Sequence, residues 1–267
     1  MTWEAYVMSQ LVQLSLRDDH IGIITLNRPA AANAFNKQLL KELNEAIQAI
    51  QIHGSIYCTV IIGVGEKAFS AGADLKERKG MTNNEVIDTV RLIGNTITNI
   101  EKMPMPVIAA LNGVAFGGGL ELALGCDIRL AADHITLGLT ETSLAIIPGA
   151  GGTQRLPRLI GIGKAKQLIY TAKRITAKEA KELGIVEEVT DSNQLFDQTI
   201  HLAKTIAKNG PIALQQAKTA INNGMQVDLT TGMEIEHLSY KETIHTEDRL
   251  EGLSAFQEKR KPVYKGK

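Results

Sequence analysis

Two glutamates could place their carboxylates beside accessible backbone amides. Glu121 follows a run of three glycines at 117–119, and Glu141 lies within the apolar segment 137–147. A glutamate in an apolar run is more often a structural partner, or simply exposed. Two of them beside glycine-rich backbone could instead hold a water molecule. One carboxylate would then accept a proton, and the other, with its pKa raised by burial, would donate one.

The triple glycine adds a second chemical group, the backbone amide. Without Cβ atoms the chain can approach a ligand closely. A helix that begins there points free N–H groups and the positive end of its dipole outward. This geometry suits a developing oxyanion, although close packing of a helix on a strand would use the same glycines. The small residues of segment 71–76 permit a similar approach, but alone they indicate only a flexible loop.

Other kinds of site fit the sequence poorly. Segment 63–68 reads Gly-x-Gly-x-x-Ala, but we expect loop and not the helix that a dinucleotide-binding turn requires. Segment 149–153 lacks the Gly-Lys-Ser/Thr ending of a phosphate-binding loop. Cys58 and Cys126 are far apart and show no zinc-site spacing, so we expect two buried free thiols and no metal.

The elements that must position these groups alternate between strands and helices. We expect a hairpin of strands 11–16 and 21–26, a helix capped by Asn36, a strand at 57–62, a long loop at 63–80 and a helix opened by Thr82. A buried strand at 107–111, a helix at 120–124, strands at 127–131 and 135–139, and short helices after 147–152 complete the pattern. From about residue 192 the pattern is helical. This order is typical of an α/β fold with a helical tail.

Composition narrows the possible partners. The 267 residues include 29 basic and 29 acidic side chains, and 44% are hydrophobic, which is typical of a soluble globular protein. Zero net charge argues against general binding to nucleic acid or to a membrane surface. We find no signal peptide and no segment that could cross a bilayer, so we expect a cytoplasmic protein.

Together these motifs resemble the enoyl-CoA hydratase/isomerase (crotonase) superfamily. The resemblance covers nearly the whole chain in the family's order, through segments 71–76, 106–113, 117–123, 147–156 and 249–260. It implies a crotonase-like α/β spiral of ββα units with the active site over 1–195, and a C-terminal helical trimerisation region over 196–267. It also implies an acyl-CoA thioester substrate, no separate cofactor, and a homo-oligomer, either a trimer or a dimer of trimers.

The resemblance also implies roles for individual residues. The N–H groups of Ala73 and Gly118 would form an oxyanion hole for the thioester carbonyl, with Glu121 as the base that activates water and Glu141 as the protonated acid. Many family members carry a lysine where this chain has Ala30, so Arg28 or other basic groups must contact the coenzyme phosphates. The residues implied in coenzyme A and substrate binding are Arg28, Ala71, Gly72, Asp74, Leu75, Lys76, Phe256 and Lys259, the last two often from a neighbouring subunit.

The expected reaction is addition of water to a trans-2-enoyl-CoA to give a 3-hydroxyacyl-CoA. Segments 71–78, 138–142, 144–148 and 220–229 most resemble the 3-methylglutaconyl-CoA hydratases of leucine breakdown, which is the first alternative. An enoyl-CoA isomerase is the second. An RNA-binding hydratase homologue is the third, and it is disfavoured because helix 36–51 holds only Lys37 and Lys41, offset by Glu42 and Glu45.

Overall fold

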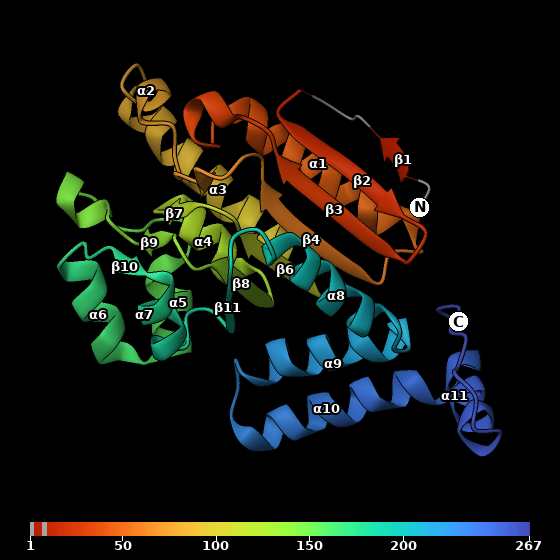
Figure 1. Cartoon of the computed structure of the whole chain (residues 1–267). Coiled ribbons are helices and arrows are strands. Elements are labelled where there is room, and N and C mark those ends of the chain that lie inside the picture. Colours follow the sequence, from red (N-terminus) through yellow and green to blue (C-terminus); the bar gives the residue numbers. More distant parts are fainter. Residues whose placement is uncertain (1–2, 7–9) are drawn as a thin grey trace.

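A computed structural model describes residues 3–6 and 10–267 of the chain. Its strands form two sheets, one of seven strands and one of four (Figure 1). The large sheet runs in the order β1 (Trp3–Tyr6), β2 (Val12–Arg17), β3 (Ile21–Leu26), β4 (Cys58–Gly63), β6 (Val107–Leu111), β8 (Ile128–Ala132) and β11 (Glu188–Thr190). The small sheet runs in the order β10 (Ile175–Thr176), β9 (Thr136–Gly138), β7 (Val114–Phe116) and β5 (Ala68–Ser70).

Helices connect and cover these sheets. The α-helices are α1 (Lys37–His53), α2 (Leu75–Arg78), α3 (Asn83–Glu101), α4 (Gly118–Gly125), α5 (Gly152–Ile160), α6 (Ile162–Tyr170), α7 (Ala177–Leu183), α8 (Leu195–Ala207), α9 (Pro211–Gly224), α10 (Leu229–Ile244) and α11 (Glu247–Gln257). Two 3₁₀ helices, η1 (Pro29–Ala31) and η2 (Glu141–Leu144), complete the set of described elements.

One connection repeats along the chain. A strand of the large sheet is followed by a strand of the small sheet and then by a helix, as in β4–β5–α3, β6–β7–α4 and β8–β9–η2. The strands β4, β6 and β8 pair in parallel, and so do β5, β7 and β9. This is the predicted spiral of ββα units, and the predicted fold class is confirmed.

Local sequence explains the longer elements. The side chain of Asn36 accepts a hydrogen bond from the N–H of Leu39 and caps α1, whose apolar stripe is buried against β2 and β3. Thr82 and Glu85 form a reciprocal capping box at the start of α3. β6 is a continuous apolar run because every residue of this central parallel strand is buried.

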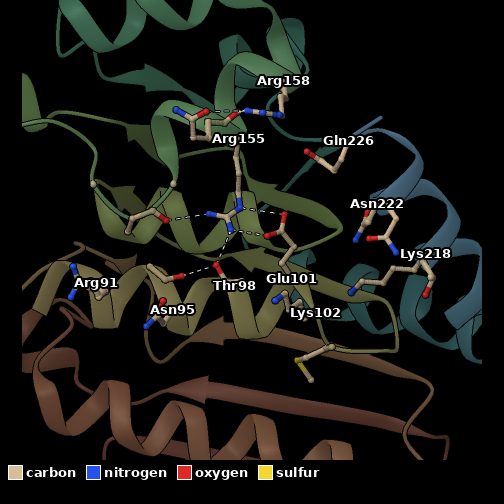
Figure 2. A pocket seen from close by; sticks show the side chains of 18 of the residues that line it. Arg91, Asn95, Thr98, Glu101, Lys102, Arg155, Arg158, Lys218, Asn222 and Gln226 are labelled. Carbon is tan, nitrogen blue, oxygen red and sulfur yellow. Dashed lines mark hydrogen bonds and ion pairs between the residues drawn. The ribbon is translucent and has the colours of Figure 1, made fainter. Parts of the chain in front are cut away.

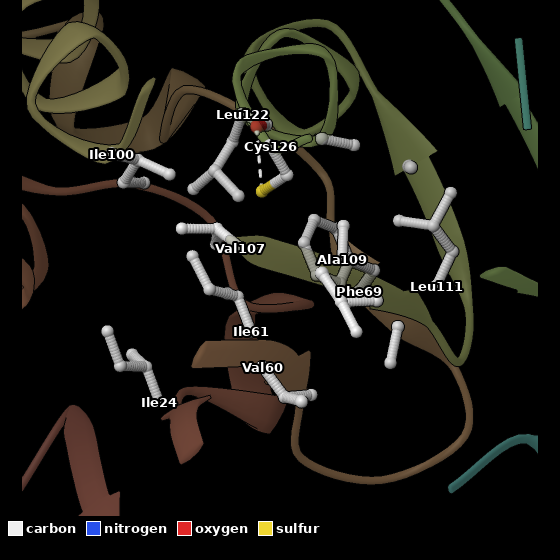
Figure 3. Packing of buried hydrophobic residues seen from close by; sticks show 14 of the residues in the cluster. Ile24, Val60, Ile61, Phe69, Ile100, Val107, Ala109, Leu111, Leu122 and Cys126 are labelled. Carbon is white, nitrogen blue, oxygen red and sulfur yellow. Dashed lines mark hydrogen bonds between the residues drawn. The ribbon is translucent and has the colours of Figure 1, made fainter. Parts of the chain in front are cut away.

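The core lies between the large sheet and the helices that pack on it (Figure 3). Ile24, Ile61 and Val107 come from neighbouring strands, and Leu122 of α4 and Ile100 of α3 pack above them. Burial of the apolar side chain at each such position stabilises the fold by about 1.5–3 kcal/mol. These contacts hold α4 in a fixed position on the sheet. Cys58 and Cys126 are buried free thiols, as predicted.

The structure corrects some of the predicted boundaries. The segment 63–80 is not one long loop, because it contains β5 and the four-residue helix α2, which Asp74 caps by accepting from the N–H groups of Lys76 and Glu77. The helix predicted at 120–124 begins at Gly118. The strands β7, β10 and β11 were not predicted, because their two or three residues are too few to show a period.

The last helices carry little of the core. α9 and α10 pack side by side below the sheets, and α11 lies at the end of the molecule opposite α2 (Figure 1). Their outer faces expose large apolar side chains, among them Met225, Leu229, Met233, Leu253 and Phe256. The chain therefore continues as a helical tail whose apolar surface the rest of this protomer does not cover.

Candidate active site

Glycines bring two distant loops into backbone contact at the N-terminus of α4. A Cβ on Gly72 would lie 2.6 Å from the carbonyl oxygen of Phe116 and 2.7 Å from the nitrogen of Gly118. A Cβ on Gly119 would overlap the carbonyl of Ser70. The segments 70–73 and 116–119 therefore lie together only because these side chains are absent.

Where these segments meet, the N–H groups of Ala73 and Gly118 have no hydrogen-bond acceptor among the described residues. Gly118 is the first residue of α4, where an N–H has no acceptor within the helix. Ala73 pairs with Phe35, but the bridge uses the N–H of Phe35 to Gly72 and the N–H of Asp74 to Phe35. The N–H of Ala73 is thus left out of that bridge.

Glu121 lies inside α4 with only 3% of its surface exposed. Its Oε1 accepts hydrogen bonds from the N–H groups of Ala150 and Gly152, each at 2.8 Å. Burial raises the pKa of Glu121, while these two amides and the positive charge of Arg155 oppose the rise. The carboxylate form is therefore supported inside an apolar helix.

Glu141 begins η2 and faces the same space. Its Oε2 is buried without a hydrogen-bond partner among the described residues. Burial, with a smaller contribution from the charge of Glu121, raises the pKa of Glu141 to about 7. Gly117, at φ +50°, leaves room for this carboxyl, because a Cβ there would lie 3.0 Å from Oε1. Glu141 can therefore hold a proton near neutral pH.

The amides and both glutamates line one cavity of about 120 Å³. Most of its other walls are apolar and come from α2, α3 and the segment 144–150. The lining residues are Ala71, Ala73, Leu75, Arg78, Val90, Ile93, Gly117, Gly118, Glu121, Thr140, Glu141, Leu144, Ile146, Ile147, Gly149 and Ala150. A proton carrier, a buried carboxylate and a pair of amides thus meet in a small, largely apolar space.

The structure brings together six of the residues predicted for the site, which are Ala71, Ala73, Leu75, Gly118, Glu121 and Glu141. Gly72 is buried directly behind them. Lys76 is exposed on α2.

Three predicted coenzyme contacts lie outside the cavity that holds the glutamates. Arg28 forms an ion pair with Asp74 at 2.7 Å and donates to the carbonyl of Ala34, so its guanidinium already has partners. Phe256 lies on α11 and Lys259 comes two residues after that helix, and both are exposed. Figure 1 shows α11 at the end of the molecule opposite α2. Within one protomer, the last two do not join the cavity.

Some lining residues were not predicted. Arg78, Val90, Ile93 and Thr140 carry no motif of their own, and they reach the cavity only because α2, α3 and η2 surround it. The amides of Ala150 and Gly152 lie in a segment that we considered from the sequence only as a phosphate-binding loop and as part of the family resemblance, not as a support for Glu121. The signal that could have located them is the glycine pattern at 149–152.

The described residues hold no group of three or more His, Cys, Asp or Glu side chains placed to bind a metal ion. In the same part of the chain, no helix has the length and apolarity that crossing a bilayer requires.

Known proteins share both the sequence and the fold of this chain. The family model for enoyl-CoA hydratase/isomerase matches residues 17–267. YngF of Bacillus subtilis (strain 168), provisionally named an enoyl-CoA hydratase/isomerase, is 55% identical over 259 residues, which cover 97% of this chain and all of YngF. The human mitochondrial methylglutaconyl-CoA hydratase is 48% identical over 257 residues, covering 94% of this chain and 76% of the human protein.

The fold comparison agrees. The crystal structure of an enoyl-CoA hydratase from Bacillus anthracis superimposes with a TM-score of 0.95 and 53% sequence identity, covering 97% of this chain and all of that one. The chain is therefore a member of the enoyl-CoA hydratase/isomerase (crotonase) family and a hydro-lyase enzyme.

Proposed function

We propose that this enzyme adds water to the α,β double bond of a trans-2-enoyl-CoA with a short acyl group. The observation that carries the proposal is the pair of buried carboxyls in one cavity. Glu141 holds a proton near pH 7, and Glu121 is supported as a carboxylate by two amides. Two buried carboxyls with different hydrogen-bond partners in one site suit paired acid and base catalysis.

The amides supply the third element of the reaction. The thioester oxygen accepts from the N–H groups of Ala73 and Gly118, and negative charge develops on it as water attacks Cβ. Preorganised donors of this kind contribute several kcal/mol to the stability of such an enolate. The water oxygen bonds to Cβ while its proton passes to Glu121. The proton of Glu141 goes to Cα, and transfer of a proton from Glu121 back to Glu141 restores the site.

The size of the cavity supports a short acyl group. A volume of about 120 Å³ corresponds to roughly four water molecules at their liquid volume. A short acyl group suits such a space better than a long straight chain.

A second candidate substrate is 3-methylglutaconyl-CoA, whose acyl group ends in a carboxylate. Arg78 is the one cation among the described residues that line the cavity, and its guanidinium has no hydrogen bond or ion pair within them. An arginine there would pair with a carboxylate at the far end of the acyl group. The 48% identity to proteins named methylglutaconyl-CoA hydratase supports the same substrate.

A kinetic comparison separates these substrates. We expect wild-type enzyme to hydrate crotonyl-CoA, and a longer trans-2-enoyl-CoA more slowly. If 3-methylglutaconyl-CoA is the substrate, Arg78→Met should lower kcat/KM for it at least tenfold while changing that for crotonyl-CoA little. Lys79→Met, at an exposed lysine directly after α2, is the matched control. Equal losses on both substrates would place Arg78 on the coenzyme and not on the acyl carboxylate.

The remaining alternatives have their own readouts. Gain of conjugated absorbance from a 3-enoyl-CoA, without hydration of crotonyl-CoA, would identify an isomerase. RNA binding has little support, because Lys41 of α1 lies 3.9 Å from Glu45 and the N–H groups of Leu11 and Val12 donate to Glu42. Filter binding at physiological salt tests it directly. Cytoplasmic location stays a prediction from the sequence.

We also propose that the enzyme works as a homo-oligomer, a trimer or a dimer of trimers, with coenzyme A bound only as part of the substrate and no other cofactor. The exposed apolar faces of α9, α10 and α11 support this assembly. A neighbouring subunit would bring Phe256 and Lys259 to the coenzyme, which one protomer alone does not do. Sedimentation analysis of the purified enzyme tests the assembly.

A further inference from the structure

The turn before α5 holds Glu121 in place. Both hydrogen bonds to Oε1 of Glu121 come from this turn, one from Ala150 and one from Gly152. Between them Gly151 takes φ +113°, a conformation that side chains rarely adopt. A Cβ on Gly152 would lie 3.0 Å from Oε1 of Glu121. The position of this short turn therefore sets the position of the carboxylate.

Arg155 holds the other side of the same turn. Its Nη1 donates to the carbonyl of Ala150 at 3.1 Å, while the N–H of that same residue donates to Glu121. Its Nη2 donates to Oε2 of Glu101 at 2.7 Å, and its Nε lies 3.4 Å from Oε1 of Glu101. Figure 2 shows the guanidinium between the turn and Glu101, with Thr98 below it.

This arrangement ties the turn to α3. The side chain of Arg155 is only 16% exposed, so it is fixed by packing as well as by its hydrogen bonds. A Cβ on Gly151 would overlap Nη1, so the turn and the guanidinium fit only with glycine at that position. Glu101, the last residue of α3, forms an ion pair with the other side of the Arg155 guanidinium.

The charges around Glu121 are few. Glu141 faces it from η2, and Arg155 acts on it from α5 with Glu101 of α3 behind. Arg78 of α2 lines the same cavity. The strands β5 and β7, which also pack on α4, carry no titratable side chain. Arg155 is thus the positive charge that opposes the effect of burial on the pKa of Glu121.

We propose that Arg155 is a positioning residue, which fixes the 150–152 turn against Glu101 and thereby aims Oε1 of Glu121. The inference rests on the proposed hydration reaction. Arg155 does not line the cavity that holds the glutamates, and it touches them only through the turn. Its loss should therefore reduce the chemical step more than substrate binding.

The test compares Arg155→Ala, Arg155→Lys and Arg158→Ala with the wild type on crotonyl-CoA. Arg158 lies one turn further along α5, is exposed and bonds only to Gln154 within the described residues, which makes it a matched control. For Arg155→Ala we expect kcat to fall about 10- to 100-fold, as loss of alignment does, with KM changed less than about threefold. The acid limb of the kcat/KM profile should move to higher pH, because an opposite charge near Glu121 is lost and its two amide donors lose their alignment.

The lysine variant separates charge from geometry. Arg155→Lys keeps the positive charge, so the acid limb of its kcat/KM profile should stay near the wild-type position. Its kcat should still fall, because one ammonium group cannot replace the contacts that the planar guanidinium makes with Ala150 and Glu101. The proposal is overturned if Arg155→Ala leaves both kcat and the acid limb unchanged, or if Arg158→Ala produces the same changes. Should Arg155→Ala fail to fold, Arg155→Lys and Glu101→Gln carry the test.

Failure of the proposed function would show separately. If wild-type enzyme hydrates no enoyl-CoA, the reaction is wrong, and the positioning role is then measured on the carboxyl itself. Carbon-13 labelling of glutamate side chains reports the titration of Glu121 by NMR. A higher pKa of Glu121 in Arg155→Ala than in the wild type supports the role, and an unchanged titration overturns it.

Discussion

Replacing Glu141 with glutamine should stabilise the fold at alkaline pH and abolish hydration. The carboxyl of Glu141 is largely buried, and its Oε2 has no partner among the described residues. An ionised group in that position is costly because no hydrogen bond replaces the lost water. Glutamine has nearly the same size and carries no charge, so it removes that cost together with the proton that the reaction needs.

The size and sign of the effect follow from the pKa. The rise of the Glu141 pKa from 4.5 to about 7 corresponds to roughly 3 kcal/mol. Solvent screening at this partly exposed group reduces the figure to about 2 kcal/mol. Below about pH 4.5 the group is protonated in both the folded and the unfolded chain, so its burial costs no stability. The loss of stability develops as the pH rises from 4.5 to about 7 and is complete above it.

The assay is thermal unfolding of the wild type and Glu141→Gln at pH 5 and pH 8.5. About 2 kcal/mol raises Tm by roughly 4–8 °C in a chain of this size. We expect that gain at pH 8.5 and a much smaller gain at pH 5. Glu66→Gln, at an exposed surface position, is the control and should change Tm little at either pH. An equal gain at both pH values would refute the assignment of the buried charge, and so would a variant less stable than the wild type at pH 8.5.

Three further outcomes are expected. Gly117→Ala forces an alanine into φ +50° with its Cβ 3.0 Å from Glu141 Oε1. It should cost about 1–3 kcal/mol of stability and lower kcat at least tenfold, whereas unchanged kinetics would show that the carboxyl does not need this space. The kcat/KM of the wild type for crotonyl-CoA should fall as the pH rises above about 7, where Glu141 loses its proton, and a profile flat to pH 9 would contradict its role as the acid. Phe256→Ala should raise KM for the coenzyme thioester with kcat nearly unchanged if a neighbouring subunit supplies Phe256, and an unchanged KM would remove Phe256 from the coenzyme site.

Periodic elements of the fold could be predicted from sequence. The stripe Leu39, Leu43, Ile47 and Ile50 repeats with the period of a helix, and the structure buries all four residues in α1. The continuous apolar run of β6 was likewise predicted as a buried strand. The four-residue helix α2 was not predicted, because its cap at Asp74 is a local hydrogen bond with no apolar repeat behind it.

The residues of the candidate site were predicted from motifs, but the residues that hold Glu121 in position were not. Glu121 and Glu141 line one cavity, as the sequence suggested they could. The amides that hold Glu121 come from Ala150 and Gly152, which lie 29 and 31 residues further along the chain. Arg155 and Glu101 are separated by 54 residues. Contacts of this range depend on how α3, α4 and α5 pack, and no local pattern encodes them.

The pairing of Arg28 with Asp74 shows a different limit. Sequence assigned both residues to the coenzyme site, yet in the structure they satisfy each other at 2.7 Å. Residue type indicates that a cation is present but not whether another part of the same chain neutralises it.

The central claim is that Glu121 and Glu141 act together on one water molecule, and hydration of crotonyl-CoA by the two single glutamine variants and the double variant tests it most directly. We predict that Glu121→Gln and Glu141→Gln each lower kcat at least about 100-fold. The double variant should be little worse than either, because groups that act as a unit are not additive. Wild-type rates in both single variants would contradict the claim.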